Sequence, residues 1–196
     1  MLPEYIIYTA VPIYIAGYFF YFKDIFFGQT KPNLVSWSLW AMIPFLGAFF
    51  QIKAGAGLSV LPVLIAGFGP LLVVIVSLYR KNSYWKITKL DIACGILALL
   101  ALIFYVLNYN LGISILFAVL GDMLAFIPTF VKSWKFPETE MPSVYLAGML
   151  SNVVGLLIIK DWSFAIYSFG IYFVVSNTIE LFILYHKKIF KIKSIS

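Results

Sequence analysis

Asp122 is the residue whose type and position most strongly suggest chemistry. It lies midway between Leu111, where an apolar stretch long enough to cross a lipid bilayer begins, and Lys132, where that stretch ends. An acidic side chain at the bilayer centre costs about 2.5–3.5 kcal/mol on insertion scales. A protonated carboxyl removes that cost, and so does a polar cavity with Asn152 and Asn177 as hydrogen-bond partners. We expect Asp122 to bind a polar solute or carry a proton, with purely structural hydrogen bonding as the alternative.

Small and polar residues recur at steps of three and four along the apolar stretches of the second half of the chain. Such steps place side chains on one face of a helix. They include Ser114, Ala118, Gly121, Asp122, Ala125, Thr129 and Lys132, and then Ala147, Gly148, Ser151, Asn152 and Gly155. Because small residues also let helices approach closely, plain helix packing is the alternative for the glycine, alanine and serine members. Asp122, Asn152 and Asn177 fall in the middle third of their stretches, and we expect them to form one polar site.

Glu180 is a second carboxylate within an apolar stretch and a second candidate for proton coupling. It lies toward the end of the last stretch, so a side chain that extends to Lys187 or to the lipid head groups is the alternative. Glu138 and Glu140 fall in a polar loop instead, where we expect solvated side chains.

Aromatic residues distinguish the first half of the chain from the second. Trp40, Tyr14 and Tyr18 lie deep within apolar stretches, where their rings could stack on a sugar or another flat solute. Trp37 and Tyr21 lie nearer the ends of theirs, where tryptophan and tyrosine commonly form a belt at the membrane interface. We therefore expect Trp40 and Tyr18 to bind solute and the other pair to face the head groups.

Three prolines lie within apolar stretches: Pro44, Pro70 and Pro128. A proline inside a helix removes one backbone hydrogen bond and permits bending. We expect these three residues to act as gating hinges.

The elements that must position these residues are transmembrane helices. Of the 196 residues, 63% are hydrophobic and 11% are charged, whereas soluble domains carry about 25% charged residues. A helix needs about 20 apolar residues to cross the hydrocarbon core. Seven stretches satisfy this requirement, and they predict an all-α integral membrane protein. They span residues 5–22, 34–52, 58–79, 91–108, 111–131, 142–159 and 163–185.

The basic residues predict the orientation of the seven helices. All but two of the 14 Lys and Arg residues fall in the first, third and fifth connections and in the C-terminal tail; the exceptions are Lys53 and Lys160. Positive loops stay in the cytoplasm, so we expect a cytoplasmic C-terminus, an outside N-terminus and a place in the plasma (inner) membrane. The same distribution explains the net charge of +6 without a nucleic-acid partner.

Residues 5–81 and 111–187 share one plan. Each contains three apolar stretches and a proline-containing loop after the first, and Trp37 and Tyr145 lie at corresponding places. Residues 82–110, with one further helix, join them, and residues 188–196 form a basic tail. The added helix gives both three-helix units the same direction across the membrane, which predicts two parallel repeats.

This plan resembles the SWEET sugar transporters and the wider PQ-loop superfamily, which have seven helices in a 3+1+3 order. The sequence likeness lies in AFIPTFVK at 125–132, EMP at 140–142 and LSNVV at 150–154. The resemblance implies that Pro128 is a gating hinge and that Ser168 or Asn177 is the polar pocket residue of the last helix. It also leaves a homo-oligomer open.

These features together favour a membrane transporter, a facilitator or a proton-coupled one, of a small polar solute such as a sugar. Transport would proceed by alternating access between the two three-helix bundles. With one His, one Cys, no HExxH motif and no phosphate-binding loop, the sequence gives no reason to expect a metal, a cofactor or an enzyme. The alternative function is that of a non-transporting seven-helix scaffold, receptor-like or an assembly protein.

Overall fold

The computed structural model describes residues 3–80, 84–107 and 110–190. Short 3-10 helices η1 (Glu4–Thr9) and η2 (Gly57–Val60) lead into α1 (Ala10–Phe26) and α4 (Leu61–Tyr79). Between them lie α2 (Leu34–Trp40) and α3 (Ile43–Lys53). The chain continues through α5 (Lys89–Leu107), α6 (Leu111–Lys135), η3 (Pro137–Thr139), α7 (Ser143–Leu157) and α8 (Phe164–Ile189). The described residues are otherwise loops and turns, without strands.

The length and composition of the helices identify an all-α integral membrane protein. Six helical segments are long and apolar enough to cross a membrane, and α7 is a shorter apolar helix. These segments coincide with the seven stretches expected from the sequence. Residue 81 of the first expected repeat, residues 108 and 109 of the linker and most of the basic tail lie outside the described residues.

The second expected span is not one continuous helix. It is divided at Ala41 and Met42 into α2 and α3, and Pro44 lies in the first turn of α3. Proline cannot donate to the carbonyl of Trp40 one turn earlier, and its ring crowds that carbonyl. The bend expected at Pro44 is therefore present as a break, whereas Pro70 and Pro128 lie inside the continuous helices α4 and α6.

Asparagine side chains fix the start of two helices. Asn33 Oδ1 accepts hydrogen bonds from the backbone N–H groups of Val35 (3.1 Å) and Ser36 (3.3 Å) at the start of α2. Asn110 Oδ1 accepts from Ile113 N–H (3.2 Å) at the start of α6. These bonds satisfy N–H groups that a helix leaves unpaired at its first turn.

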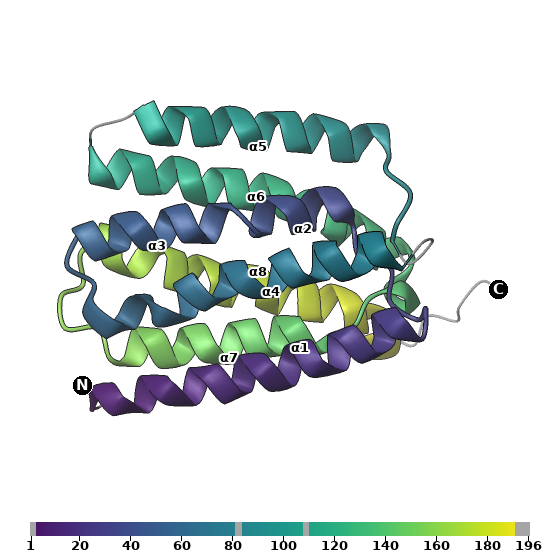
Figure 1. Cartoon of the computed structure of the whole chain (residues 1–196), viewed down its shortest axis with the longest axis horizontal. Coiled ribbons are helices and arrows are strands. Elements are labelled where there is room, and N and C mark those ends of the chain that lie inside the picture. Colours follow the sequence, from purple (N-terminus) through teal and green to yellow (C-terminus); the bar gives the residue numbers. More distant parts are fainter. Residues whose placement is uncertain (1–2, 81–83, 108–109, 191–196) are drawn as a thin grey trace.

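For comparison of their contacts we call α1 to α4 the first helix group and α6 to α8 the second. In the first group α4 contacts both α1 and the α2–α3 segment, and in the second α8 contacts both α6 and α7. Between the groups, α1 packs along α7, and α2 and α3 pack against α6. Figure 1 shows α5 at one edge of the bundle, where it packs along α6.

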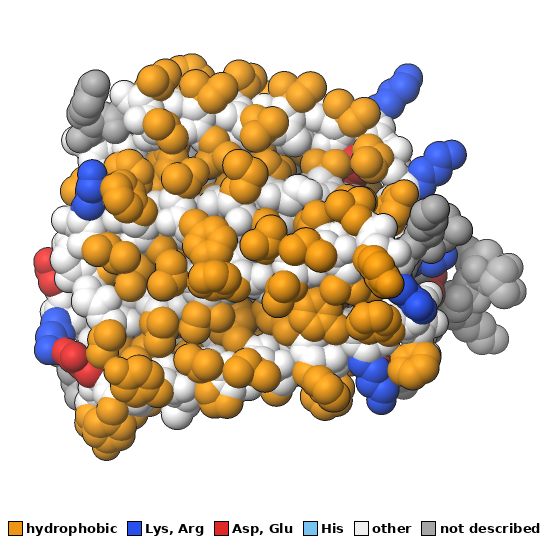
Figure 2. All heavy atoms as spheres, in the orientation of Figure 1, with side chains coloured by type: hydrophobic (Ala, Val, Ile, Leu, Met, Phe, Trp, Pro, Cys, Tyr) orange, Lys and Arg blue, Asp and Glu red, His pale blue; other side chains and the backbone are white. Residues whose placement is uncertain are grey.

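The flank of the bundle is apolar and its two ends are charged. Figure 2 shows hydrophobic side chains over the length of the helices, with Lys, Arg, Asp and Glu gathered toward the ends. On α5 the exposed large hydrophobic side chains are Leu90, Ile92, Ile96, Leu97, Leu99, Leu100, Ile103, Phe104, Val106 and Leu107. A surface of this kind matches a lipid bilayer as its surroundings.

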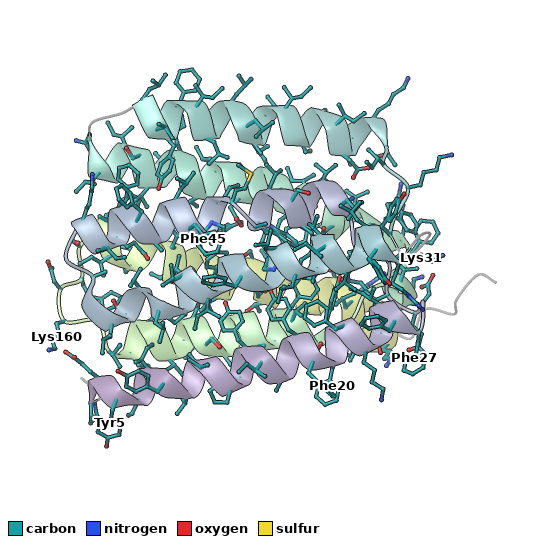
Figure 3. All side chains as sticks on the ribbon, in the orientation of Figure 1. Tyr5, Phe20, Phe27, Lys31, Phe45 and Lys160 are labelled. Carbon is teal, nitrogen blue, oxygen red and sulfur yellow. The ribbon has the colours of Figure 1, made fainter. Side chains whose placement is uncertain are left out.

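The two ends differ in charge, and we name them accordingly. Lys31 and Phe27 lie at one end, and Tyr5 and Lys160 lie at the other (Figure 3). We call the first the basic end, because the connections between α1 and α2, α4 and α5, and α6 and α7 meet there, and most of the described Lys and Arg residues lie in these connections or in the adjoining helix turns. The second is called the opposite end.

Candidate functional site

A cavity of about 50 Å³ lies at the centre of the bundle. It is lined by residues from α1, α2, α3, α4, α6, α7 and α8, that is, from every described α-helix except α5. The lining residues are Tyr14, Tyr18, Trp37, Trp40, Pro44, Ala66, Pro70, Phe126, Val144, Tyr145, Gly148, Phe173 and Asn177. Of the solute-binding residues expected from the sequence, the structure thus places Tyr18, Trp40 and Asn177 on the wall of the same cavity.

Aromatic rings form most of the cavity wall because of their spacing along two helices. Tyr14 and Tyr18 are four residues apart on α1 and stack with ring centroids 6.1 Å apart. Trp37 and Trp40 are three residues apart on α2 and meet edge to face at 5.3 Å. Both spacings place side chains on one helix face. Phe126 of α6 completes this wall, 4.4 Å from the ring centroid of Trp40.

The expectation that Trp37 and Tyr21 form an interfacial belt was wrong. Both side chains are in the core, with exposed fractions of 1% and 0%. Their rings lie against each other with centroids 4.9 Å apart, and the Tyr21 hydroxyl has an internal hydrogen-bond partner, Glu140. Neither ring reaches the head groups, because Trp37 packs against Tyr18 and Trp40 and the Tyr21 hydroxyl bonds to a loop residue that folds inward.

The cavity carries unused hydrogen-bond donors. The indole nitrogens of Trp37 and Trp40 are buried and have no partner among the described residues. Indole N–H groups only donate, and a buried donor without an acceptor is unfavourable. None of the described residues that line the cavity is charged. The site is therefore suited to an uncharged molecule that carries acceptor atoms.

Asn177 and Asn152 lie on either side of Gly148. Asn177 Nδ2 donates to the carbonyl of Phe173 (2.7 Å), and a Cβ on Gly148 would lie 3.1 Å from Asn177 Oδ1. Asn152 Nδ2 donates to the carbonyl of Gly148 (2.9 Å) and lies 3.5 Å from the Tyr14 hydroxyl. Asn177 reaches the central cavity, whereas Asn152 lines a smaller void of about 10 Å³.

Two further voids lie between the helices on the side of the opposite end. The small void beside Asn152 is also lined by Gln51, whose Nε2 donates to the carbonyl of Ile166 (2.8 Å). Ser59 and Ile166 line both this void and a larger one of about 240 Å³, which lies beside the ion-paired Glu4 and Lys160. No described residue lines both the small void and the central cavity, so in this conformation the cavity is separate from these voids.

Asp122 is fully buried but is not on the cavity wall. Its Oδ2 accepts a hydrogen bond from the hydroxyl of Tyr172 on α8 (2.7 Å), and its Oδ1 has no partner among the described residues. This corrects the expectation that Asn152 and Asn177 are its partners, because both amides bond to carbonyl groups of their own helices. The polar stripe of α6 that contains Asp122 is nevertheless buried, as its spacing indicated.

The remaining expected site residues divide between the cavity and its surroundings. Pro44 and Pro70 line the cavity. Pro128 and Ser168 are buried on α6 and α8 away from its wall, and the Ser168 hydroxyl has no partner among the described residues. Two members of the predicted α7 stripe pack against α1: Ser151 Oγ donates to the carbonyl of Ala10 (3.3 Å), and the Ala147 side chain lies against Gly17. For these members the helix-packing alternative is the better interpretation.

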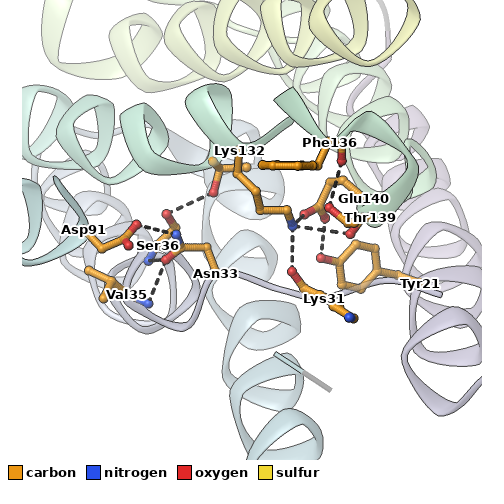
Figure 4. Close-up of polar contacts among 11 residues, drawn as sticks. Tyr21, Lys31, Asn33, Val35, Ser36, Asp91, Lys132, Phe136, Thr139 and Glu140 are labelled. Carbon is orange, nitrogen blue, oxygen red and sulfur yellow. Dashed lines mark hydrogen bonds and ion pairs between the residues drawn. The ribbon is translucent and has the colours of Figure 1, made fainter. Parts of the chain in front are cut away.

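A buried polar cluster closes the basic end (Figure 4). Lys132 of α6 forms an ion pair with Glu140, and the Tyr21 hydroxyl of α1 donates to the same carboxylate. Lys132 Nζ also donates to the carbonyl of Lys31 (2.6 Å), and Lys31 N–H donates to the carbonyl of Thr139 (2.9 Å). We call Tyr21, Lys31, Lys132, Thr139 and Glu140 the basic-end cluster. It joins α1 and its following loop to α6 and its following loop.

The expectation of solvated glutamates after α6 holds for Glu138 but was wrong for Glu140. Glu138 is exposed, whereas Glu140 is 6% exposed. Nothing in the local sequence separates the two. The signal that could have found the cluster is the pairing of a lysine at a span end with an acidic residue in the following short loop.

Two further hydrogen bonds lie beside the cluster. Thr129 Oγ1 donates to Ser36 Oγ (3.0 Å) and so links α6 to α2. Asn33 Nδ2 donates to Asp91 Oδ1 (2.6 Å) and links the start of α2 to the first turn of α5. The first bond is a polar contact between the two helix groups, and the second, drawn in Figure 4, ties the first group to α5.

In comparisons with known proteins, no family model, no curated protein and no solved structure matches the chain. Function is therefore inferred from the residues of this chain and their geometry.

Proposed function

We propose that the chain is a membrane transporter of a small polar, uncharged solute that binds in the central cavity. The observation that carries the proposal is the origin of the lining residues, because every described α-helix contributes to the wall except α5. A site built from both helix groups changes shape whenever the groups move relative to each other. Alternating access between two bundles requires a site of this kind.

The packing order supports two parallel three-helix repeats joined by α5. In each group the third segment lies between the first and the second: α4 between α1 and α2–α3, and α8 between α6 and α7. Between groups, the first segment of one packs on the second segment of the other in both directions, as α1 on α7 and as α6 on α2–α3. This reciprocal pattern fits a two-fold relation about an axis along the membrane normal, and it agrees with the resemblance to the SWEET and PQ-loop proteins.

The wall chemistry supports an uncharged solute with a flat or ring-shaped body. Rings of Tyr14, Tyr18 and Trp40 offer faces for stacking, and the indole N–H groups of Trp37 and Trp40 offer donors to acceptor oxygens or nitrogens. In this conformation about 50 Å³ is available. One water needs roughly 10–15 Å³ on this scale, so the cavity holds a solute of a few heavy atoms. A sugar is one candidate that would require some separation of the helix groups.

The orientation follows from the charge of the ends. We propose that the basic end faces the cytoplasm and that the N-terminus is outside, in the plasma (inner) membrane. The basic-end cluster then closes the cytoplasmic side, and the larger void beside Glu4 and Lys160 lies on the outer side.

The test is uptake of a solute panel into proteoliposomes, combined with tryptophan fluorescence of the purified chain. The panel contains a hexose, a polyol, a planar heteroaromatic amide and a charged amino acid. Uncharged members should be taken up and should change the fluorescence.

Trp40→Phe keeps an aromatic ring but loses the indole N–H, so it should weaken solute binding about fivefold, the value of a hydrogen bond worth about 1 kcal/mol. Trp162→Phe is the matched control, because Trp162 is 55% exposed.

A non-transporting scaffold is the second candidate function. The small volume of the cavity and its closure by the basic-end cluster favour it. This alternative predicts no uptake of any panel member and no difference between Trp40→Phe and Trp162→Phe in fluorescence response.

A further inference from the structure

Glu180 is a buried carboxyl group without a defined role in the cavity. It lies on α8 with an exposed fraction of 0%, and neither of its oxygens has a partner with hydrogen-bond geometry among the described residues. The alternative that its side chain extends to Lys187 or to the lipid head groups is therefore wrong, because the carboxyl is fully buried and Lys187 Nζ donates to the carbonyl of Lys135 (3.3 Å).

The surroundings of Glu180 are the basic-end cluster. Its polar neighbours are Ser133 and Lys132 on α6 and Glu140 in the following loop. The hydroxyls of Tyr21 on α1 and Tyr145 on α7 are also within electrostatic range. Ser133, like Glu180, is fully buried. The unpartnered carboxyl thus lies beside the basic-end cluster, which is one of the contacts that hold the two helix groups together at this end.

The charges of this region do not balance when every group is ionised. Two carboxylates, Glu140 and Glu180, share one ammonium group, that of Lys132. Lys132 is paired with Glu140, and its other N–H groups donate to the carbonyls of Lys31 and Thr139. A charge on Glu180 would then be buried without a partner, which is unfavourable in a protein interior.

We propose that Glu180 is the proton-binding site of a gate at the basic end, and that the basic-end cluster is the closed state of this gate. The proposal rests on the proposed transport function, which it deepens by naming the coupled ion. In the closed gate Glu180 is a neutral acid, and Lys132 is fully engaged by Glu140 and by Lys31.

Opening the gate separates Tyr21 and Lys31 from Lys132 and Glu140, because the first pair belongs to one helix group and the second to the other. Lys132 thereby loses a carbonyl partner, and water enters. The O–H bond of the Glu180 carboxyl then breaks, its proton passes to water, and the resulting carboxylate is stabilised by the freed donor of Lys132. Closing reverses each step. High pH on this side therefore favours the open gate, and low pH favours the closed one.

Asp122 is less suited to this role. Its Oδ2 is held by the Tyr172 hydroxyl within the second helix group. Both residues belong to α6 and α8, so separation of the two groups leaves their bond intact. Glu180 differs because a partner becomes available only when the groups separate.

The gate is tested by thiol accessibility, which requires no solute. Ala66→Cys is introduced at the cavity wall on a Cys94→Ala background, and the full-length chain is reconstituted in lipid vesicles. A membrane-impermeant methanethiosulfonate reagent is added from the basic end, and each labelling rate is divided by that of the same thiol in denatured protein at the same pH. The normalised rate should rise with pH, by at most about tenfold per unit for one proton.

Glu180→Gln should give a low rate at every pH, because it imitates the neutral acid. Glu180→Asp keeps a titratable group and should keep the rise, which provides a second variant if the glutamine fails to fold. Glu138→Gln is the matched control: the same change at an exposed position of the η3 segment should leave the parent profile unchanged.

A parent profile that stays flat, or a Glu180→Gln profile that follows the parent, overturns the proposal. The same holds if Asp122→Asn is the variant that removes the rise. Failure of the transport proposal looks different, since it leaves the labelling pattern intact while no member of the solute panel is taken up.

Discussion

The ring of Tyr18 lies directly against Gly69. A Cβ atom at position 69 would be 2.0 Å from Cζ of the tyrosine, closer than any real contact. The glycine of α4 therefore makes room for an α1 side chain that forms part of the cavity wall. This contact ties the shape of the cavity to the packing of α1 on α4.

We expect Gly69→Ala to displace Tyr18 and to destabilise the protein by about 1–3 kcal/mol, the usual effect of overpacking. The displaced ring also changes the cavity, so the tryptophan fluorescence response to solute should weaken. Thermal unfolding in detergent and fluorescence titration measure the two effects. Gly112→Ala is the control, because an added Cβ there meets its nearest atom at an ordinary 3.4 Å. Equal stability of the two variants would show that Tyr18 yields without cost.

The two ion pairs of the described residues predict losses of stability of very different size when one partner is removed. Lys132 and Glu140 are 1% and 0% exposed, whereas Lys160 and Glu4 are 71% and 45% exposed. Glu140→Gln leaves a buried ammonium without its counter-charge, and we expect a loss of about 3–5 kcal/mol. Glu4→Gln should cost about 0–1 kcal/mol. Unfolding midpoints in detergent give both values, and similar shifts for both variants would contradict the structural role of the cluster.

The seven apolar segments and their approximate limits could be predicted from the sequence, because a segment that crosses lipid must be apolar over its length whatever its partners are. The predicted ends at residues 22, 131 and 185 fall four residues short of the ends of α1, α6 and α8. The break before Pro44 and the buried polar stripe of α6 follow from local rules as well, namely the missing proline donor and the helical period.

The cluster and the partner of Asp122 could not be predicted in this way. Tyr21 and Glu140 are separated by 119 positions in the sequence, and their bond exists only because the loop after α6 folds against α1 at the basic end. Tyr172 pairs with Asp122 because α6 and α8 pack in one particular rotation. Local spacing carries no information about that rotation, so the more obvious amides, Asn152 and Asn177, were favoured instead.

The topology is predicted to place the Glu138 and Asp161 loops on opposite faces of the membrane. Both residues are exposed, so a cysteine at either position should react without disturbing the interior. On a Cys94→Ala background, Glu138→Cys should be labelled by an impermeant maleimide only from the cytoplasmic face and Asp161→Cys only from outside. Reaction of both thiols from one side would exclude the parallel arrangement of the two three-helix units.

Pro44 is predicted to keep the α2–α3 segment divided. Pro44→Ala restores an N–H that can donate to the carbonyl of Trp40, which favours one continuous helix across Ala41 and Met42. A straighter segment would move Trp37 and Trp40 relative to the rest of the wall, so solute exchange should slow while the folded fraction is unchanged. Uptake rates and circular dichroism test the two halves of this expectation. Pro62→Ala is the control, because Pro62 lies in the first turn of α4, where proline breaks no helix hydrogen bond.

Variants of Asp122 and Tyr172 distinguish a structural role of the Asp122 carboxyl from a role in proton coupling. Tyr172→Phe removes the hydrogen bond to Asp122 Oδ2 and leaves a buried carboxyl with no partner, so we expect a loss of about 1–3 kcal/mol of stability. Asp122→Asn retains an oxygen that accepts from the same hydroxyl, so it should be tolerated. If Asp122 has only this structural role, Asp122→Asn keeps the pH profile of uptake and of thiol labelling, whereas Glu180→Gln abolishes both. Loss of the pH profile in Asp122→Asn, with folding preserved, would assign the proton-binding role to Asp122 in place of Glu180. Normal transport and stability in Asp122→Ala would instead show that the carboxyl serves neither purpose.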